Sequence, residues 1–318
     1  PMPGIDALKR EVKTYREVAY NLYEQLEADP AQIKNLLAIS IDNRQAKENP
    51  VRIQEAMFFP EVYSWHDQVV AGADLDKIDW TVPLKGYDAF VPYNKVNIGR
   101  PSSVHKLDRI VPRLPEAWMR KQVAEIMNVF RVNGLAYDGQ NFFDTDHTHP
   151  AAKGTYSNVT TPNWSTTSAP TFAEASACME EVRARFVTNL ALDAEVIDGS
   201  KLQNSIVVIA HNATTWAMFE QLRVANFVPS STEPNIWKSG FQLLLDNKPT
   251  SGQTDYLEVI LALPNGPRPA FFVLDAEPVL DAWETNQVPN GYVAVGLTEG
   301  IFGVKAGYPQ TAIQVRPT

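Results

Sequence analysis

The stretch Tyr137-Asp-Gly-Gln-Asn-Phe-Phe-Asp-Thr-Asp-His147 combines a turn signal, an aromatic pair and a dense polar cluster. Its opening Tyr-Asp-Gly is typical of a turn, because aspartate and glycine tolerate the backbone angles that turns require. Phe142 and Phe143 are expected to be buried and to anchor the turn to a core. Asp144 and Asp146 are expected to accept backbone amide protons, as aspartates do in Asx turns. The stretch therefore predicts a compact, polar turn on an apolar anchor.

A long amphipathic helix is predicted directly before this stretch, over residues 113–133. Prolines at 112 and 115 suit a helix start, since proline presets φ and lacks an amide that the first turn leaves unpaired. Apolar residues then recur near helical spacing as far as Phe130, with charged residues between them. Asn133-Gly134 supplies a left-handed stop. Such a helix would run about 31 Å, long enough to form the spine of a domain.

Upstream of the helix, the sequence predicts an extended hairpin within residues 71–103. Residues 78–84 alternate between apolar and polar and read as one strand, and residues 90–98 read as the returning strand. Prolines at 83 and 92 cannot donate to a strand ladder, which places the hairpin at an edge. Three of its residues are therefore expected to contact a neighbouring copy of the chain: Trp80, Val82 and Tyr87.

The first 70 residues are predicted to form an N-terminal arm. Between Ile5 and Leu26, apolar residues are spaced alternately by three and four, which makes a heptad seam. The seam indicates either a helix that covers the chain's own core or an arm that packs on a neighbouring copy, and the sequence leaves both open. A short helix near residues 33–37 follows. An aromatic cluster is then expected to dock the arm on the main body: Phe58, Phe59, Tyr63 and Trp65.

Downstream of the motif, the pattern predicts a second lobe of mixed helices and strands. Residues 154–170 are rich in Thr, Ser, Asn and Pro and read as a surface loop. Thr171-x-x-Glu174 forms a capping box that begins a helix. Residues 205–210 read as a strand, and Asn212 as the cap of the next helix. From residue 241 to 313, short strands alternate with Pro and Gly turns.

Composition excludes several classes of protein. The net charge of −9, without a basic stripe, argues against a surface that grips nucleic acid, although a protein that encloses DNA remains open. The single Cys178 excludes an internal disulfide, and its place beside an apolar helical seam predicts a buried, inert thiol. No apolar run approaches the roughly 18 residues that span a membrane, and no signal-peptide pattern begins the chain. An intracellular protein without a membrane partner is expected.

One polar cluster offers an alternative function. Asp144, Asp146, His147 and His149 could supply metal ligands, as in a metal-dependent hydrolase. Ligand-spaced partners are not evident elsewhere, because the remaining histidines are isolated in the sequence. The expected roles are instead those of a turn. The chain is therefore expected not to be an enzyme, with no catalytic residue, no cofactor and no metal. The histidines outside the cluster are His66, His105 and His211.

The stretch 137–147 closely resembles the signature YDGQNFFDTDHP of the Mu-like bacteriophage major head subunit family. Here Thr148-His149 lies between His147 and the proline, which is a small departure. Weaker similarity extends from about Trp65 to the C-terminus. The residues that carry the family motif are Tyr137, Asp138, Gly139, Asn141, Phe142, Phe143, Asp144, Asp146 and His147.

The resemblance implies an α+β chain with the Hong Kong 97-type capsid fold. Its parts would be an N-terminal arm (1–70), an extended hairpin or E-loop (71–103) that reaches over an adjacent subunit, a peripheral domain with the spine helix (104–202), an axial domain (203–290) and a C-terminal return (291–318).

The implied function is that of a major capsid protein, assembled in the host cytoplasm and located in the virion. Hexamers and pentamers of the chain would form an icosahedral shell around double-stranded DNA, without sequence-specific binding. Portal, scaffold and decoration proteins are the implied partners. A cellular nanocompartment shell of the same fold is a further alternative.

Overall fold

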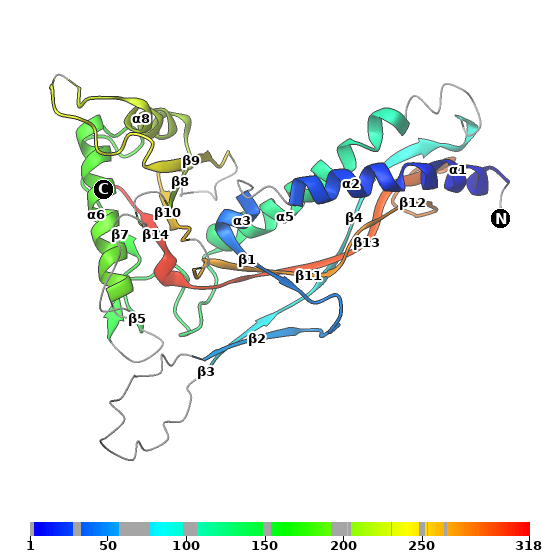
Figure 1. The fold of residues 1–318 in the computed structure, drawn as a ribbon, viewed down its shortest axis with the longest axis horizontal. Helices are drawn as coiled ribbons and strands as arrows, with labels where there is room; N and C mark the ends of the chain where they lie inside the picture. The colour runs from blue at the N-terminus through cyan, green and yellow to red at the C-terminus, as the bar shows by residue number, and fades with distance from the viewer. Residues whose placement is uncertain are drawn as a thin grey trace, which may run out of the picture. The chain divides into compact units, whose positions relative to one another are not determined.

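The computed structural model describes residues 3–27, 33–56, 77–97, 107–148, 154–191, 202, 205–229, 231–247, 252, 254–263 and 266–318 (Figure 1). The chain divides into two compact units, each built from separate stretches of sequence. Unit 1 comprises Pro1–Val51, Val82–Asn128 and Phe271–Lys305. Unit 2 comprises Arg52–Thr81, Val129–Ala270 and Ala306–Thr318.

Unit 1 is built on a five-stranded sheet. Its strand order is β1-β11-β13-β12, and β4 also pairs with β13. The long β13 is antiparallel to both β12 and β4, with an irregularity opposite β4 between Leu297 and Gly300. The strand bounds are β1 Ala38–Asp42, β4 Lys85–Asn94, β11 Ala270–Ala276, β12 Val279–Trp283 and β13 Tyr292–Ala306.

An aromatic cluster forms the centre of unit 1. Trp118 and Tyr87 both pack on Phe302, with ring centroids 5.4 and 4.3 Å away. Gly300 lies so close to the indole that a Cβ at this position would be 2.1 Å from Trp118 Cη2. The missing side chain of Gly300 therefore makes room for Trp118 against β13.

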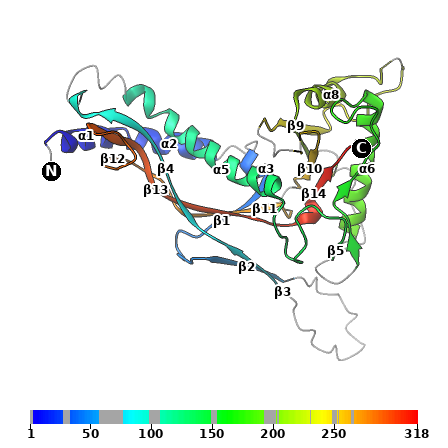
Figure 2. The ribbon, with the colours of Figure 1, turned by 180° about the vertical axis from the view of Figure 1, so that it is seen from behind.

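The helices of unit 1 begin with α1 (Pro3–Thr14), α2 (Arg16–Glu27) and α3 (Ile33–Leu37). Figures 1 and 2 show α1 and α2 running beside β12. Leu8 and Val12 are fully buried, and Arg16 Nε donates to the carbonyl of Leu280 on β12 over 2.8 Å. The heptad seam thus covers the chain's own core. Of the two interpretations of the seam, this is the helix that packs on its own chain. A 3-10 turn, η1, spans Lys95–Asn97.

The predicted spine helix is confirmed as α5, Arg113–Val132. Its residues up to Asn128 belong to unit 1 and its last four to unit 2. Asn133 then adopts a positive φ of 49°, the left-handed stop that the Asn-Gly pair predicted. Apolar side chains at helical spacing are buried, in the order Leu114, Trp118, Met119, Ile126, Met127 and Phe130.

The predicted pairing of residues 78–84 with 90–98 is wrong. β3 (Lys77–Val82) pairs with β2 (Val51–Ala56) in a separate two-stranded sheet, whereas β4 pairs with β13. The expected turn at 85–88 is extended and belongs to β4. The physical reason is that the distant β13 competes with β3 for β4. It forms hydrogen bonds along almost the whole of β4, and no local turn signal reveals this pairing.

The apolar residues of the predicted hairpin are covered within the chain. Trp80, in unit 2, is only 3% exposed and packs edge-on against Tyr308 and Tyr137, with ring centroids 5.2 and 6.3 Å away. Val82 is fully buried, and Tyr87 is half-buried on Phe302. The expectation that Trp80 and Val82 face a neighbouring copy therefore loses its physical basis, since neither has an exposed apolar face.

Unit 2 contains a second five-stranded sheet, in the order β7-β14-β10-β8-β9. β10 is antiparallel to β14 and β8, while β8–β9 and β14–β7 are parallel. Every residue of β8 and β10 is buried, which explains their almost unbroken apolar sequences. The bounds are β7 Val159–Thr160, β8 Ile206–Ala210, β9 Phe241–Leu245, β10 Leu257–Leu261 and β14 Ala312–Val315.

Two helices, α6 (Phe172–Ala191) and α8 (Ala213–Val224), share a hydrophobic core with this sheet (Figure 2). The predicted caps are confirmed. Thr171 N donates to the Glu174 carboxylate over 2.7 Å, and the Asn212 side chain accepts from Thr215 N at 2.7 Å. Two further short strands, β5 (His147–Thr148) and β6 (Thr155–Tyr156), pair with each other, and η2 spans Pro309–Thr311.

The surface loop predicted over residues 154–170 is partly wrong. It contains β6 and β7, and Tyr156, Val159 and Thr160 are buried. The polar composition concealed these contacts because the buried backbone is satisfied by pairing with β5 and β14. Several sequence predictions lie outside the described residues: the aromatic cluster of Phe58, Phe59, Tyr63 and Trp65, and any role for His66, His105 or His149.

Candidate functional site: the loop of residues 133–148

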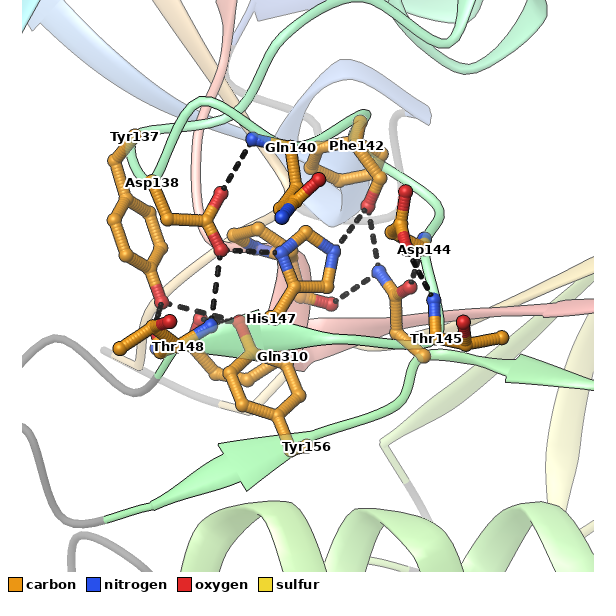
Figure 3. A network of polar contacts seen from close by, with 12 residues as sticks. Tyr137, Asp138, Gln140, Phe142, Asp144, Thr145, His147, Thr148, Tyr156 and Gln310 are labelled. Atoms are coloured by element: carbon orange, nitrogen blue, oxygen red, sulfur yellow. Dashed lines mark hydrogen bonds and ion pairs between the residues drawn. The ribbon is translucent and has the colours of Figure 1, made fainter.

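The sequence motif lies on a loop, residues 133–148, and Figure 3 shows the polar contacts of its part from Tyr137 to Thr148. The Asn133 side chain accepts from Phe143 N at 2.6 Å, and Phe142 N donates to Gly134 O over 2.7 Å. Nearer the tip, Leu135 and Asn141 form an isolated bridge. These contacts close the loop directly after α5, so that the helix stop and the motif form one structure.

Phe142 and Phe143 anchor this loop, as the sequence predicted. Both are buried, and their ring centroids lie 4.9 Å apart in an edge-on arrangement. Phe130, from the last turns of α5, packs on both rings at 5.9 and 6.3 Å. Burial of three aromatic rings in one cluster is the main apolar contribution to holding the loop in place.

Asp138 is the principal acceptor of the loop (Figure 3). Its Oδ1 accepts from Gln140 N at 3.2 Å, which makes an Asx turn, and its Oδ2 accepts from Thr148 N at 3.1 Å. The sequence assigned this role to Asp144 and Asp146. Asp144 does accept a backbone amide, from Thr145 at 2.7 Å, but Asp146 is exposed and hydrogen-bonds to no other described residue. The expectation is therefore wrong for Asp146.

His147 is fully buried beneath the loop, with its ring stacked on Tyr156 at a centroid distance of 5.1 Å. Its Nδ1 lies 2.8 Å from Asp138 Oδ2, and its Nε2 lies 3.1 Å from the carbonyl oxygen of Phe142. Both ring nitrogens thus face an oxygen of the chain, and neither is open to a metal ion. The histidine joins the two ends of the motif.

Asn158 connects the loop to the rest of unit 2 and was missed by sequence reasoning. Its Oδ1 accepts from Asp144 N at 2.8 Å. Its Nδ2 donates to Phe142 O and Pro309 O, over 2.6 and 3.2 Å. Its backbone carbonyl accepts from Gln314 N on β14 at 2.8 Å. One fully buried amide therefore ties the motif to the C-terminal strand, although it lies in a polar stretch that gives no periodic signal.

Two tyrosines extend the network toward the C-terminal segment (Figure 3). Tyr137 Oη donates to Thr148 O over 2.8 Å and lies 3.2 Å from Tyr156 Oη. Tyr156 Oη in turn donates to Gln310 Oε1 over 3.4 Å. The Tyr137 side chain thus links the start of the motif to β5 by a hydrogen bond.

A chain of charges, here called the ionic chain, comprises the half-buried Arg131 and the buried Asp246, His211 and Glu258. The Arg131 guanidinium donates to both oxygens of Asp246, over 2.9 and 2.5 Å. His211 Nδ1 lies 3.5 Å from Asp246 Oδ2, and its Nε2 makes a short hydrogen bond with Glu258. Gln314 Nε2 donates to the other Glu258 oxygen over 3.2 Å. The last turn of α5 is therefore tied by charge to the unit 2 sheet.

The ionic chain changes the protonation of its histidine. Burial by itself lowers the pKa of His211, but hydrogen bonding of its ring to the carboxylates of Asp246 and Glu258, together with their charges, outweighs burial and raises the pKa to about 9. His211 is isolated in the sequence, because the two carboxylates that contact it, those of Asp246 and Glu258, come from distant segments of the chain. A buried imidazolium flanked by two carboxylates neutralises charge that would otherwise destabilise the core.

The described residues were also searched for a metal cluster, a lined groove and a reactive thiol. Among the described residues, no three His, Cys, Asp or Glu side chains are placed to hold a metal ion. Two grooves in unit 1, of about 520 and 750 Å³, are lined by no motif residue and no histidine or cysteine. Burial raises the pKa of Cys178 to about 12, which makes this thiol a poor nucleophile. Within the described part of the chain, no helix is long and apolar enough to cross a membrane.

The sequence matches no protein-family description and no curated protein. The structure, in contrast, is similar to solved capsid structures. Cyanophage P-SCSP1u supplies one, with a TM-score of 0.51 and 8% identity over 88% of this chain and 87% of that chain. The capsid of the native GTA particle supplies another, with a TM-score of 0.50 and 8% identity over 89% of this chain and 88% of that chain.

These similarities define the class of fold. The chain has the Hong Kong 97-type fold of phage major capsid proteins, with mixed helices and strands matched over most of its length. The fold predicted from the motif is thereby confirmed. At 8% identity the similarity establishes the fold alone, and function requires a separate argument.

Proposed function

We propose that the chain is a major capsid protein whose copies assemble into a closed shell. The observation that carries this proposal is the Hong Kong 97-type fold, matched over nearly nine-tenths of the chain to capsid proteins. The candidate site supports it, because the motif's buried polar groups bond to one another instead of converging on an open cavity. Such internal hydrogen bonds stabilise the fold of the subunit, which is the role expected of a structural protein.

In its finer form, the proposal is a Mu-like bacteriophage head subunit. The signature at 137–147 supports this assignment, as it closely resembles that family's pattern. Copies would form hexamers and pentamers of an icosahedral head, assembled in the host cytoplasm with portal and scaffold proteins. Each copy would have an N-terminal arm, a peripheral part and an axial part. The net charge of −9 suits a wall that encloses double-stranded DNA without gripping it.

Light scattering of the expressed chain tests this proposal. Particles far larger than the 35.5 kDa chain are expected over a range of salt and protein concentrations. A single species of one chain's mass under all conditions would contradict the proposal. The measurement is repeated with added scaffold protein, since some shells close only in the presence of a scaffold.

The contents of purified particles separate the remaining alternatives. Double-stranded DNA inside particles purified from the natural source supports a viral head, whereas a protein cargo without nucleic acid supports a cellular nanocompartment. Stoichiometric zinc or manganese, lost in a His147→Ala/His149→Ala variant that still folds, would favour a metal-dependent hydrolase. The occupied nitrogens of His147 lead us to expect no such metal.

A further inference from the structure

A groove of about 750 Å³ in unit 1 lies between strand β4 and the start of helix α5. Its strand side consists of four consecutive residues, Asp88–Val91. Its other side is formed by a short helical segment before α5 and by the first residues of α5 itself. The lining residues on that side are Arg109, Ile110, Arg113, Leu114 and Ala117. We call this groove the β4 groove, and its volume is in the range of ligand-binding clefts.

The strand beside the groove has a free edge. β4 pairs with β13 on one side, where Phe90 lies opposite Gly296 and Val91 lies opposite Val295. Among the described residues, no other strand pairs with β4. In an antiparallel ladder, successive residues direct their N–H and C=O groups alternately to the two sides of the strand. Part of this backbone therefore points away from β13 and can hydrogen-bond to one further strand.

The β4 groove follows this free edge. Successive side chains of a strand point to opposite faces of its sheet, so a groove over one face is lined by alternate residues. Here all four residues from Asp88 to Val91 line the groove. The groove therefore runs along an edge of β4, and since β13 pairs with the other edge, it lies beside the unpaired one.

Positive charge without a partner lies across the groove from this edge. Arg109 and Arg113 are both exposed, and neither guanidinium has an ion pair or a hydrogen bond with any described residue. The one carboxylate that lines the groove belongs to Asp88, which accepts from Thr298 Oγ1 over 2.8 Å. Two arginines against one aspartate give the groove a positive balance, although the whole chain has a net charge of −9.

We propose that the β4 groove binds an extended, acidic segment of a partner protein, which adds a strand to β4 and directs its carboxylates to Arg109 and Arg113. Main-chain hydrogen bonds to a free sheet edge supply affinity, and the alternating side chains supply specificity. A guanidinium can hold a carboxylate by two parallel hydrogen bonds. Apolar side chains of the same segment would cover the half-buried Phe90 and Val91, which is 36% exposed.

The charge pattern points to a different protein as the occupant, not to a second copy of this chain. A strand that serves both arginines needs two carboxylates. Each described strand of this chain carries at most one Asp or Glu, so no such strand could serve both arginines of a neighbouring copy. This inference goes beyond the proposed function, since it does not depend on the assembly of copies.

Fluorescence anisotropy with the full-length chain tests the groove. The probe is a labelled, end-capped peptide of alternating glutamate and valine, and we expect saturable binding that weakens as salt screens the charges. The same peptide with lysine in place of glutamate is expected to bind at least about tenfold more weakly. A version N-methylated at its backbone amides is expected to lose binding to a similar extent, because it cannot donate to a strand edge.

Variants of the chain locate the site. R109E and R113E are each expected to weaken binding of the glutamate peptide by about tenfold or more. R109K/R113K keeps both charges and is expected to bind more tightly than either reversal. The matched control is R183E, an exposed arginine of α6 without an ion pair, which is expected to bind as the wild type does. Circular dichroism should be unchanged in every variant, because the altered side chains are exposed.

The outcomes separate this inference from its rivals and from the proposed function. Absence of saturable binding would overturn it, as would equal binding by R109E and R113E or by the N-methylated peptide. If the peptide blocks self-assembly, and R109E and R113E weaken assembly as much as they weaken peptide binding, the occupant is a second copy and the partner assignment is wrong. Peptide binding by a chain that forms no particles would support the groove and contradict the shell alone.

Discussion

The centre of unit 1 and the loop at 133–148 of unit 2 are stabilised by different physical means. In unit 1, Trp118 packs against Phe302 of β13, and the missing side chain of Gly300 on the same strand leaves room for the indole ring. In the loop, the buried His147 is satisfied by contacts with the chain itself, and the buried Asn158 beside the loop donates to the carbonyl of Phe142. The first region should be sensitive to volume, and the second to the loss of a donor or acceptor.

The largest expected effect is at the point where the loop relies on apolar packing. Phe143→Ala removes a buried ring from the cluster with Phe130 and Phe142 and should lower the free energy of unfolding by roughly 3–5 kcal/mol. Denaturant titration measures this change. Substitution of the exposed Leu135 by Ala is the control, and an equal loss in both variants would contradict the anchor role.

The ionic chain predicts a dependence of stability on pH. The pKa of His211 is raised to about 9 in the folded protein, from an ordinary value of 6.5. Its imidazolium therefore stabilises the fold fully below pH 6.5, and this stabilisation, of about 3 kcal/mol, is lost as pH rises to about 9. Denaturant titrations from pH 6 to 10 should show the decline. His211→Gln should flatten this part of the profile, and an unchanged slope would contradict the assignment.

The side-chain amide of Asn158 should contribute more to the stability of the fold than its small size suggests. Asn158→Ala leaves the amide of Asp144 and the carbonyls of Phe142 and Pro309 without their side-chain partner, at a cost of about 2–3 kcal/mol. Asn141→Ala, at an exposed position of the 133–148 loop, is the matched control and should change stability little. Hydrogen exchange should rise at Asp144 in the first variant. Equal stabilities of the two variants would refute the proposed role.

The smallest expected change in stability comes from adding a methyl group to the packed centre of unit 1. Gly300→Ala places a methyl group 2.1 Å from the Trp118 ring and should cost about 1–3 kcal/mol by overpacking. Gly86→Ala, on β4 of the same unit, meets nothing within 4 Å and should be tolerated. Thermal melts of the two variants provide the comparison. A destabilised Gly86→Ala with an unaffected Gly300→Ala would reverse the expected order.

Local chemistry predicted the elements whose signals lie within one stretch of sequence. The α5 helix, its Asn133 stop and the Thr171 and Asn212 caps depend on neighbours a few residues away. The burial of Phe142 and Phe143 followed from the same reasoning, and the motif's resemblance predicted the fold.

Predictions failed where the deciding partner is distant in sequence. β4 pairs with β13, some 200 residues later, so the local hairpin signal was misleading. Asn158 and His211 acquire their roles from segments that only the fold brings together. Asp146, in contrast, was given a turn role that Asp138 performs, because both aspartates fit the same local pattern.

Electron cryomicroscopy of the assembled chain is the most direct test of the central claim, that this is a shell subunit whose signature stretch is structural. We expect closed particles with icosahedral symmetry, in which each subunit has the described fold and His147 lies buried between Asp138 and Phe142. Protein that forms no closed particles, alone or with its scaffold, or density for a metal ion at His147, would contradict it.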